Sequence, residues 1–258
     1  MKLAPRALPE LLAGRRIASV TGTNGKTTTT HFLTAAVRAE TPDGQRSVVT
    51  NADGANLHHG IVSALGQAPD ATIAVLETDE RVVADVVAMG SPEVLVLLNF
   101  SRDQLDRNHE LTFLGRDWRA ALEKAAEHGT TVVAHARGPL IVWVCQKARH
   151  VIWVDTKPRW TADATLCPNC GAVLIHSDQG WDCPGCELQQ PAADWWVEDH
   201  DAVEASGRRF HLDVQVPGSF NLTNATCALA AAIHMGIQPE DALRGIATVK
   251  SPAGRYAT

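Results

Sequence analysis

Residues Ser19–Thr30, SVTGTNGKTTTT, decide the fold, because they join a short apolar run to a helical pattern through a glycine-rich turn. The predicted strand is Arg16–Val20 and the predicted helix is Lys26–Ala39. Gly22 and Gly25 allow backbone N–H groups of the turn to approach phosphate oxygens without a clash from Cβ atoms. The helix N-terminus adds partial positive charge at the same point. The stretch therefore predicts a loop that binds nucleotide phosphates.

The loop departs by one position from the common spacing G-x-x-x-x-G-K-[ST], since Val20 stands at the place of the first glycine. Lys26 is expected to reach the β- and γ-phosphates of ATP, and the Thr27 hydroxyl to ligate Mg²⁺. The alternative is a glycine-rich turn that contains a lysine by chance, and the order of strand, turn and helix favours the phosphate loop. The predicted nucleotide contacts of the loop are Thr23, Asn24, Gly25, Lys26, Thr27 and Thr28.

Short β-rich runs alternate with longer amphipathic runs over residues 16–154. The predicted strands are Arg16–Val20, Ser47–Thr50, Thr72–Glu77, Val94–Asn99, Thr131–Ala134 and His150–Val154. The predicted helices are Lys26–Ala39, Leu57–Leu65, Glu80–Met89, Thr112–His128 and Pro139–Lys147. The runs ATIAVLE and EVLVLLN are too apolar to face water on one side. The pattern predicts an α/β fold in which a mostly parallel sheet carries helices on both faces.

Four of the six cysteines form the pattern C-x₂-C-x₁₂-C-x₂-C, with proline or glycine inside each knuckle. The predicted ligands of a closed, structural zinc site are Cys167, Cys170, Cys183 and Cys186. Zinc could fold this insertion, which the sequence predicts to have no core of its own. A catalytic or redox role and a nucleic-acid contact are the weaker alternatives. Cys145 and Cys227 stand alone in apolar stretches, so the cysteines do not indicate a disulfide framework.

Composition excludes several classes of protein. The 258 residues are 45% hydrophobic and 20% charged, which is typical of a globular chain, and the net charge is −6. That charge argues against a nucleic-acid partner that is bound through a basic face. No apolar run of 18 residues is present, and Pro5 and Pro9 interrupt the start of the chain, which therefore does not resemble a signal peptide. We expect a cytoplasmic protein.

The pattern changes after Asp155. Residues 156–193 are predicted to form an inserted zinc ribbon between two parts of one ATP-binding domain, residues 1–155 and 194–250. The run VEASGRRFHLDVQVPG predicts a hairpin with its turn at Ser206–Gly207, followed by one helix that ends at Gly236 and another that begins at Pro239. Residues 251–258 are expected to begin a linker to a C-terminal domain that is missing from this sequence.

The motif TGTNGKTTT resembles the ATP loop of the Mur ligases, the amide-forming enzymes of peptidoglycan synthesis, and of the related folylpolyglutamate synthetases. In that superfamily the shorter glycine spacing is usual. The segments TNADGAN (50–56), LETDE (76–80), NFSRDQLDRNHE (99–110), PGSFNLTNA (217–225) and AGR (253–255) resemble further family segments in the same order. The resemblance covers about residues 14–258 and implies the central domain of a Mur ligase.

The resemblance implies roles for residues outside the loop. Asn221 and Asn224 would contact adenine, and Arg255 would lie at the junction with the C-terminal domain and contribute to nucleotide binding. Glu77 would bind Mg²⁺ or polarise the attacking group, or it would only cap a strand end. Asp103 would bind metal or substrate, or begin a charged helix. Two accounts also stay open for Asn51, which would touch the γ-phosphate or acceptor, or serve ordinary turn chemistry.

Two departures from the wider family concern a second magnesium site. Gln104 stands where many Mur ligases have a Mg²⁺-binding histidine. Arg119 lies near the position at which some have a carbamylated lysine, and Lys124 lies farther along. We therefore predict no carbamate.

The cysteine insertion resembles one subfamily, the MurT ligase subunits of lipid II isoglutaminyl synthase. That resemblance implies an ATP-dependent amide ligase subunit that uses ATP, Mg²⁺ and Zn²⁺ and activates the α-carboxyl of D-glutamate in lipid II. Ammonia would come from a GatD-type glutamine amidotransferase partner, at the inner face of the membrane. The alternatives are another Mur-type or folylpolyglutamate-type ligase, and a non-catalytic zinc-ribbon module with an ATP-binding scaffold.

Overall fold

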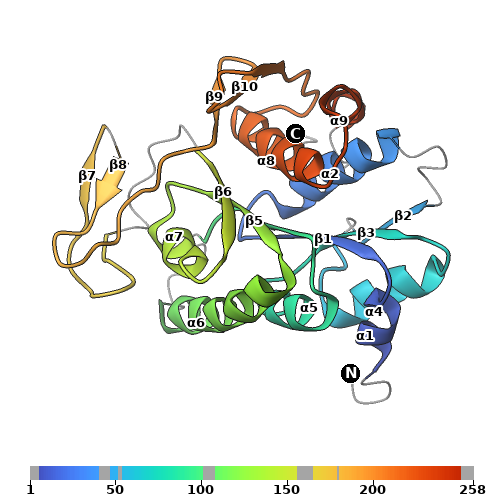
Figure 1. The fold of residues 1–258 in the computed structure, drawn as a ribbon, viewed down its shortest axis with the longest axis horizontal. Coiled ribbons are helices and arrows are strands. Elements are labelled where there is room, and N and C mark those ends of the chain that lie inside the picture. The colour runs from blue at the N-terminus through green and yellow to red at the C-terminus, as the bar shows by residue number, and fades with distance from the viewer. Residues whose placement is uncertain are drawn as a thin grey trace, which may run out of the picture.

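The computed structural model describes residues 6–40, 47–51, 54–100, 108–155, 165–178 and 180–250, with the backbone alone for 108–112. Its centre is a nine-stranded sheet in the order β11-β10-β9-β6-β5-β4-β1-β3-β2 (Figure 1). The strands from β2 to β9 in this order are parallel, and β10 and β11 join antiparallel at one edge. The strands are β1 (Arg16–Thr21), β2 (Val48–Thr50), β3 (Ile73–Glu77), β4 (Val94–Leu97), β5 (Thr131–His135), β6 (His150–Val154), β9 (Trp195–Glu198), β10 (Asp201–Glu204) and β11 (Arg209–His211).

Helices cover both faces of the sheet, as Figure 1 shows. One face carries α2 (Lys26–Glu40), α8 (Phe220–His234) and α9 (Pro239–Ile246). The other face carries α1 (Ala7–Leu12), α4 (His58–Gln67), α5 (Val83–Gly90), α6 (Asn108–Ala125) and α7 (Pro139–Cys145), and a 3-10 turn (Ala126–His128) follows α6. The central strands are buried on both sides, which explains why their sequences are almost continuously apolar.

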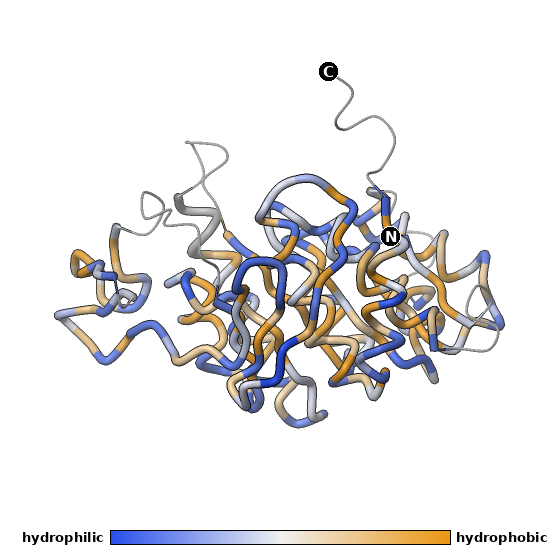
Figure 2. The backbone as a smooth tube through the Cα atoms, turned by 90° about the horizontal axis from the view of Figure 1, so that it is seen from above, coloured by the Kyte–Doolittle hydropathy of each residue, from blue (hydrophilic) through white to orange (hydrophobic). Residues whose placement is uncertain are grey.

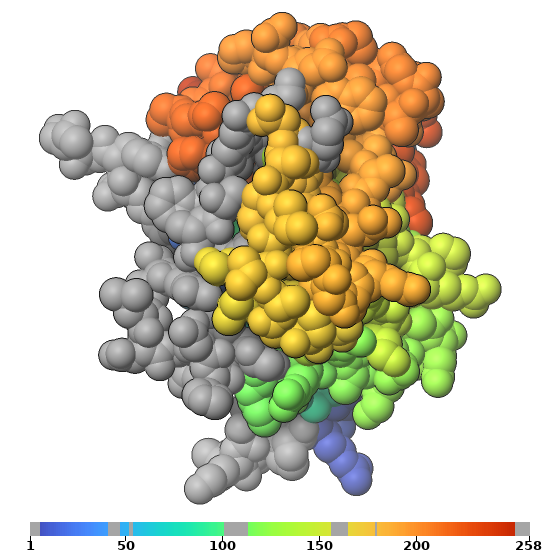
Figure 3. Space-filling model, turned by 90° about the vertical axis from the view of Figure 1, so that its left-hand side faces the viewer, coloured from blue at the N-terminus to red at the C-terminus, as the bar shows by residue number. Residues whose placement is uncertain are grey.

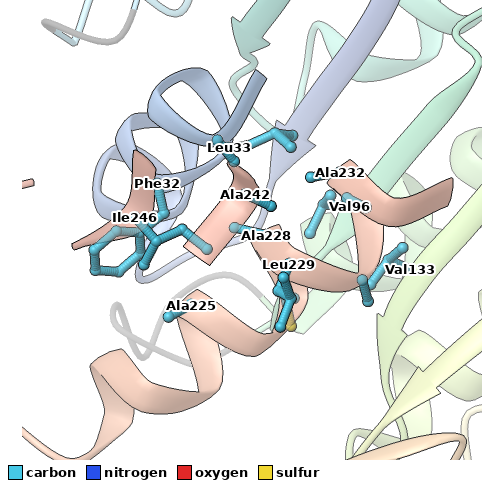
Figure 4. Close-up of a cluster of buried hydrophobic side chains, with 14 of the residues drawn as sticks. Phe32, Leu33, Val96, Val133, Ala225, Ala228, Leu229, Ala232, Ala242 and Ile246 are labelled. Atoms are coloured by element: carbon cyan, nitrogen blue, oxygen red, sulfur yellow. The ribbon is translucent and has the colours of Figure 1, made fainter. Parts of the chain in front are cut away.

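Small residues bring α8 and α9 close to the centre of the molecule. Ala225, Ala228 and Ala232 of α8 are fully buried and belong to the cluster that includes Val96 and Val133 of the sheet (Figure 4). In α9, a Cβ atom added at Gly245 would stand 2.2 Å from a backbone oxygen of α2. Close packing therefore places α8 and α9 in one cluster with α2, the helix that follows the phosphate loop.

The predicted α/β fold is confirmed, and the structure corrects several element boundaries. Helix α5 begins at Val83 rather than at Glu80, because residues 78–82 form a turn at the carboxyl end of β3. Strand β4 ends at Leu97 rather than at Asn99. Helix α1 and strand β9 were not predicted, since neither short segment has a clear apolar period in the sequence. Within the described part of the chain, no helix combines the length and the apolar character needed to cross a membrane.

The cysteine-rich segment lies at one end of the sheet, where it extends from the main body (Figures 1 and 2). Figure 3 views the molecule from this end, with the segment in yellow at the front. Its hairpin consists of β7 (Ile175–Ser177) and β8 (Gly180–Asp182). The sequence predicted that this segment has no core of its own, and it did not predict that the segment packs against the main domain. Leu174, Trp181 and Leu188 are buried and belong to the same apolar cluster as side chains of α6 and α7. Packing therefore links the ribbon to the helical layer that contains α6 and α7.

Candidate nucleotide and metal sites

The phosphate loop leaves β1 at Thr21 and enters α2 at Lys26. Gly22 has φ +139° and Gly25 has φ +87°, which are values that residues with a Cβ rarely adopt. A Cβ at Gly22 would also stand 2.9 Å from the backbone nitrogen of Asn99. Both glycines are therefore required by conformation, and Gly22 also by a close backbone approach.

Asn99, which follows β4, holds the outer part of the loop. Its backbone oxygen accepts a hydrogen bond from the N–H of Thr23 at 2.8 Å. Its side-chain Oδ1 accepts from the N–H of Asn24, and its Nδ2 donates to the oxygen of Asn24, both at 2.9 Å. Sequence analysis assigned no role to Asn99, although the residue lies in a segment that resembles a family motif.

The side chain of Lys26 turns into its own loop. Its Nζ donates to the backbone oxygens of Gly22 at 2.5 Å and Thr23 at 3.3 Å, and lies 3.4 Å from Oε1 of Glu80. The charged ends of Lys26 and Glu80 are largely buried, with side-chain exposures of 14% and 19%. A phosphate would be a stronger partner for this ammonium than the two carbonyl oxygens. The sequence predicted Glu80 as the first residue of a helix, and the structure places it beside the lysine.

Helix α8 brings Asn221 and Asn224 to the loop. Oδ1 of Asn224 would lie 2.9 Å from a Cβ atom built on Gly25, so the two residues are in close contact. Nδ2 of Asn224 donates to Oδ1 of Asn221 at 3.0 Å, and Nδ2 of Asn221 donates to the oxygen of Pro217 at 2.7 Å. Residues about 200 positions apart thus meet where the loop leaves the carboxyl end of β1, which is consistent with their predicted role in one nucleotide site.

Glu77 ends β3 and is 2% exposed. Its Oε1 accepts a hydrogen bond from Nδ2 of Asn56 at 3.0 Å, whereas Oε2 is buried and has no hydrogen-bond partner among the described residues. A buried carboxylate oxygen without a partner is costly unless a cation or donor reaches it. Glu77 offers a carboxylate oxygen, and Thr27, in the first turn of α2, offers a hydroxyl. Mg²⁺ prefers oxygen ligands, so these residue types fit a magnesium ion.

The side chain of Asn51, another predicted site residue, makes its hydrogen bonds to backbone atoms of the protein. Its Oδ1 accepts from the N–H of Glu77 at 2.9 Å, and its Nδ2 donates to the oxygens of Glu77 and Ala55 at 2.8 and 2.9 Å. This arrangement agrees with the turn role that was one of its two predicted accounts. Asp103 and Arg255, together with Gln104, lie outside the described residues, so their predicted roles stay predictions.

The two basic residues considered for a second magnesium site lie elsewhere. Arg119 donates to the backbone oxygen of Trp143 and its guanidinium lies 4.4 Å from the centroid of that indole ring, which joins α6 to α7. Burial lowers the pKa of Arg119 from its usual range. Lys124 is exposed in the last turn of α6. Neither residue contacts the phosphate loop.

The four predicted zinc ligands converge. All four Sγ atoms of Cys167, Cys170, Cys183 and Cys186 lie within 4.8 Å of one another. The Cys170–Cys183 and Cys167–Cys186 sulfur pairs are 3.4 and 3.6 Å apart. Tetrahedral zinc with bonds of about 2.3 Å requires sulfur separations of about 3.8 Å, so the cluster fits this ion.

Backbone donors support the cysteine cluster. The N–H of Asn169 points to the sulfur of Cys167 and the N–H of Gly185 to that of Cys183, each at 3.4 Å. The pKa of Cys186 is lowered to about 6, chiefly because the Asn169 side chain hydrogen-bonds to its sulfur. These donors favour the thiolate of Cys186, the form that ligates metal, whereas burial raises the pKa of Cys167 to about 12.

Fold and loop together define a phosphate-loop α/β protein with an additional four-cysteine cluster. Residues 20–232 match the family model described as the Mur ligase middle domain. Because this match covers most of the chain, the chain belongs to the Mur ligase family and contains its middle domain.

Among curated proteins, the chain is similar to subunit MurT of lipid II isoglutaminyl synthase (glutamine-hydrolyzing) from two organisms. The protein from Staphylococcus aureus (strain COL) is 26% identical over 257 residues, which cover 93% of this chain and 57% of the relative. The protein from Streptococcus pneumoniae (strain ATCC BAA-255 / R6) is 28% identical over 273 residues, covering 97% of this chain and 60% of the relative. The chain therefore spans less than two thirds of the length of these relatives.

Solved structures show the same fold at lower sequence identity. A pseudomurein peptide ligase type C from Methanothermus fervidus matches with a TM-score of 0.69 and 20% identity, over 93% of this chain and 50% of that one. MurF ligase from Thermotoga maritima in complex with ADP matches with a TM-score of 0.60 and 20% identity, over 96% and 52%. At this identity the match supports the fold and not the substrate.

Proposed function

We propose that the chain is the ATP-binding part of an ATP-dependent amide ligase that amidates the D-glutamate α-carboxyl of lipid II to D-isoglutamine. The observation that carries the proposal is that three features lie at the carboxyl ends of the parallel strands. Lys26 lies in the phosphate loop, Asn224 touches Gly25 of that loop, and Glu77 offers a free carboxylate oxygen. The names of the MurT relatives supply the reaction.

In the proposed reaction, a carboxylate oxygen of the substrate attacks the γ-phosphorus of ATP, ADP leaves, and an acyl phosphate forms. Ammonia then attacks the acyl carbon, and phosphate leaves with formation of the amide. Lys26 and the loop N–H groups stabilise charge on the transferred phosphoryl group. Glu77 and Thr27 would hold Mg²⁺, which neutralises charge on the phosphate oxygens. Asn221 and Asn224 would position the adenosine end, so that this chain acts mainly by placing its reactants.

We further propose that ammonia comes from a GatD-type glutamine amidotransferase subunit. The MurT relatives are named as subunits of a glutamine-hydrolyzing enzyme, which supports a separate partner. In the described chain, the two cysteines outside the cluster, Cys145 and Cys227, are buried, and burial raises the pKa of both thiols. Neither thiol is suited to act as a glutaminase nucleophile.

The cysteine cluster would hold structural zinc, because four thiolates fill a tetrahedral site and leave no position for a substrate. The acceptor is attached to a membrane lipid, so the proposed place of action is the cytoplasmic face of the membrane. Other Mur-type acceptors are the rival proposal. A UDP-N-acetylmuramate–L-alanine ligase from Saccharopolyspora erythraea is also a relative, at 28% identity over 97% of this chain and 45% of that protein.

The decisive experiment measures ATP hydrolysis by the full-length protein on lipid II, with ammonia or with glutamine plus the glutaminase subunit. We expect stimulation, with amidated lipid II as the product and loss of activity in Lys26→Ala. Parallel reactions receive UDP-N-acetylmuramate with L-alanine, or a folate with glutamate. Activity on one of those pairs and none on lipid II would replace the proposed acceptor. Absence of turnover on every acceptor by zinc-loaded protein would favour a binding module.

A further inference from the structure

Asn56 is the described side chain that holds the Glu77 carboxylate, and the MurT-like function does not assign it a role. Its Nδ2 donates to Oε1 of Glu77 at 3.0 Å and leaves the buried Oε2 without a partner. An amide N–H on one oxygen fixes the rotation of a carboxylate. The second oxygen then faces in one direction, as a single anionic ligand.

The turn that carries Asn56 is fixed at several points. The N–H of Asp79 donates to the backbone oxygen of Asn56 at 3.0 Å, which ties the turn to the end of β3. Asn51 donates to the oxygen of Ala55 and also brackets the backbone of Glu77. Below the turn, a Cβ at Gly60 would stand 2.2 Å from the oxygen of Ala55, so α4 supports it in close contact.

We propose that Asn56 is a positioning residue that orients the Glu77 carboxylate so that Oε2 alone is presented to the magnesium ion. The inference rests on the proposed function, since it assumes a metal–nucleotide complex at the phosphate loop. Partners that orient metal-binding carboxylates commonly change metal affinity by 10- to 100-fold when they are removed. Asn56 donates a hydrogen bond and carries no charge, so it does not neutralise the carboxylate that is presented to the cation.

The test compares nucleotide binding with and without metal in the full-length protein. A fluorescent, non-hydrolysable ATP analogue is titrated in Mn²⁺ and in EDTA. The Kd in EDTA divided by the Kd in Mn²⁺ reports the contribution of the metal to binding. In Asn56→Ala we expect this ratio to fall by about tenfold or more, while the Kd in EDTA changes less than twofold. Gln67→Ala, which removes an exposed amide from α4, is the control and should leave both Kd values unchanged.

A second variant separates positioning from folding. Asn56→Leu keeps most of the side-chain volume without the donor, so it should show the same loss of the metal-dependent ratio at an unchanged Tm. An unchanged ratio in both variants, or equal weakening in Mn²⁺ and EDTA, would overturn the role of Asn56. If the unsubstituted protein binds the analogue without any effect of Mn²⁺, or does not bind it, the proposed function itself fails.

Discussion

The phosphate loop and the cysteine cluster are two sites built in opposite ways. The loop site collects side chains from the β1–α2 turn, the ends of β3 and β4, and α8, which extend over residues 22–224. The cluster takes its four ligands from residues 167–186 and from two knuckles of the same form. A site of local ligands can be predicted from spacing, whereas a site of distant ligands depends on how the sheet is ordered.

The two sites also differ in what holds them together. The outer part of the loop is held by hydrogen bonds within the protein, as in the three hydrogen bonds between Asn99 and the loop backbone. In the cluster, sulfur atoms 3.4–3.6 Å apart face each other, and ionised thiolates at that distance repel unless a cation lies between them. We therefore expect the loop to keep its shape without ligand and the ribbon to depend on metal.

The largest effect is expected from breaking the cluster. Cys183→Ser should abolish zinc binding, which in comparable sites contributes about 10–16 kcal/mol. The ribbon should then unfold, and Tm should fall because Leu174 and Trp181 pack in the same cluster as α6 and α7. Metal content by mass spectrometry and proteolysis within residues 165–193 would measure this. Nucleotide affinity should change less than about threefold, if the loop is fixed without the ribbon.

Ser177→Ala, in the exposed strand β7, is the control for that experiment and should retain zinc. Equal loss of zinc and of nucleotide binding in Cys183→Ser would show that the two sites are not independent.

The second largest effect is expected from a substitution in the phosphate loop, which should lower ATP turnover and leave the cysteine cluster intact. Lys26→Ala should lower ATP turnover by about 10²–10³-fold, because it removes the charged donor to the transferred phosphoryl group. Zinc content should stay at the level of the unsubstituted protein. Lys147→Ala removes an exposed lysine that pairs with Glu123, and it should keep full turnover. Normal turnover in Lys26→Ala would exclude the loop as the catalytic phosphate site.

A smaller effect distinguishes strain from contact at the loop. Gly25 and Gly129 both have positive φ, at +87° and +78°, but only Gly25 has a side chain, that of Asn224, against it. Gly129→Ala should lower the free energy of unfolding by about 1 kcal/mol through backbone strain alone. Gly25→Ala should cost more, by about 1–3 kcal/mol, since Asn224 must move. Urea unfolding of both variants measures the difference, and equal costs would contradict the close contact.

The smallest effect is expected at the ion pair between Glu80 and Lys26. Glu80→Gln removes the charge that lies 3.4 Å from Nζ and competes with phosphate for it. Nucleotide affinity should rise by a factor of about two to five, because the ammonium no longer has to leave a carboxylate in order to bind phosphate. Glu123→Gln, at an exposed pair away from the loop, should leave affinity unchanged. A fall in affinity in Glu80→Gln would instead assign Glu80 to the bound state.

Sequence alone determined the features that depend on near neighbours. The order of strand, glycine turn and helix at residues 16–39 predicted the loop, and the spacing of the four cysteines predicted their convergence. Continuous apolar strands predicted a parallel sheet covered on both faces, because a strand buried on both sides has no place for polar side chains. The six strands predicted over residues 16–154 are all present, with shifts of one or two residues at their ends.

Tertiary structure decided the features that depend on strand order and on contacts between distant residues. Only the folded sheet shows that Asn99 holds the loop, that Glu80 reaches Lys26 and that Asn56 holds Glu77. Asparagine and glutamate at strand ends are equally suited to turns and to ligand binding, so their residue type does not reveal the partner. The burial of Leu174, Trp181 and Leu188 was missed for the same reason, since these residues belong to one apolar cluster with side chains of α6 and α7. Spacing along the chain fixes local geometry, and packing across the sheet selects the partners.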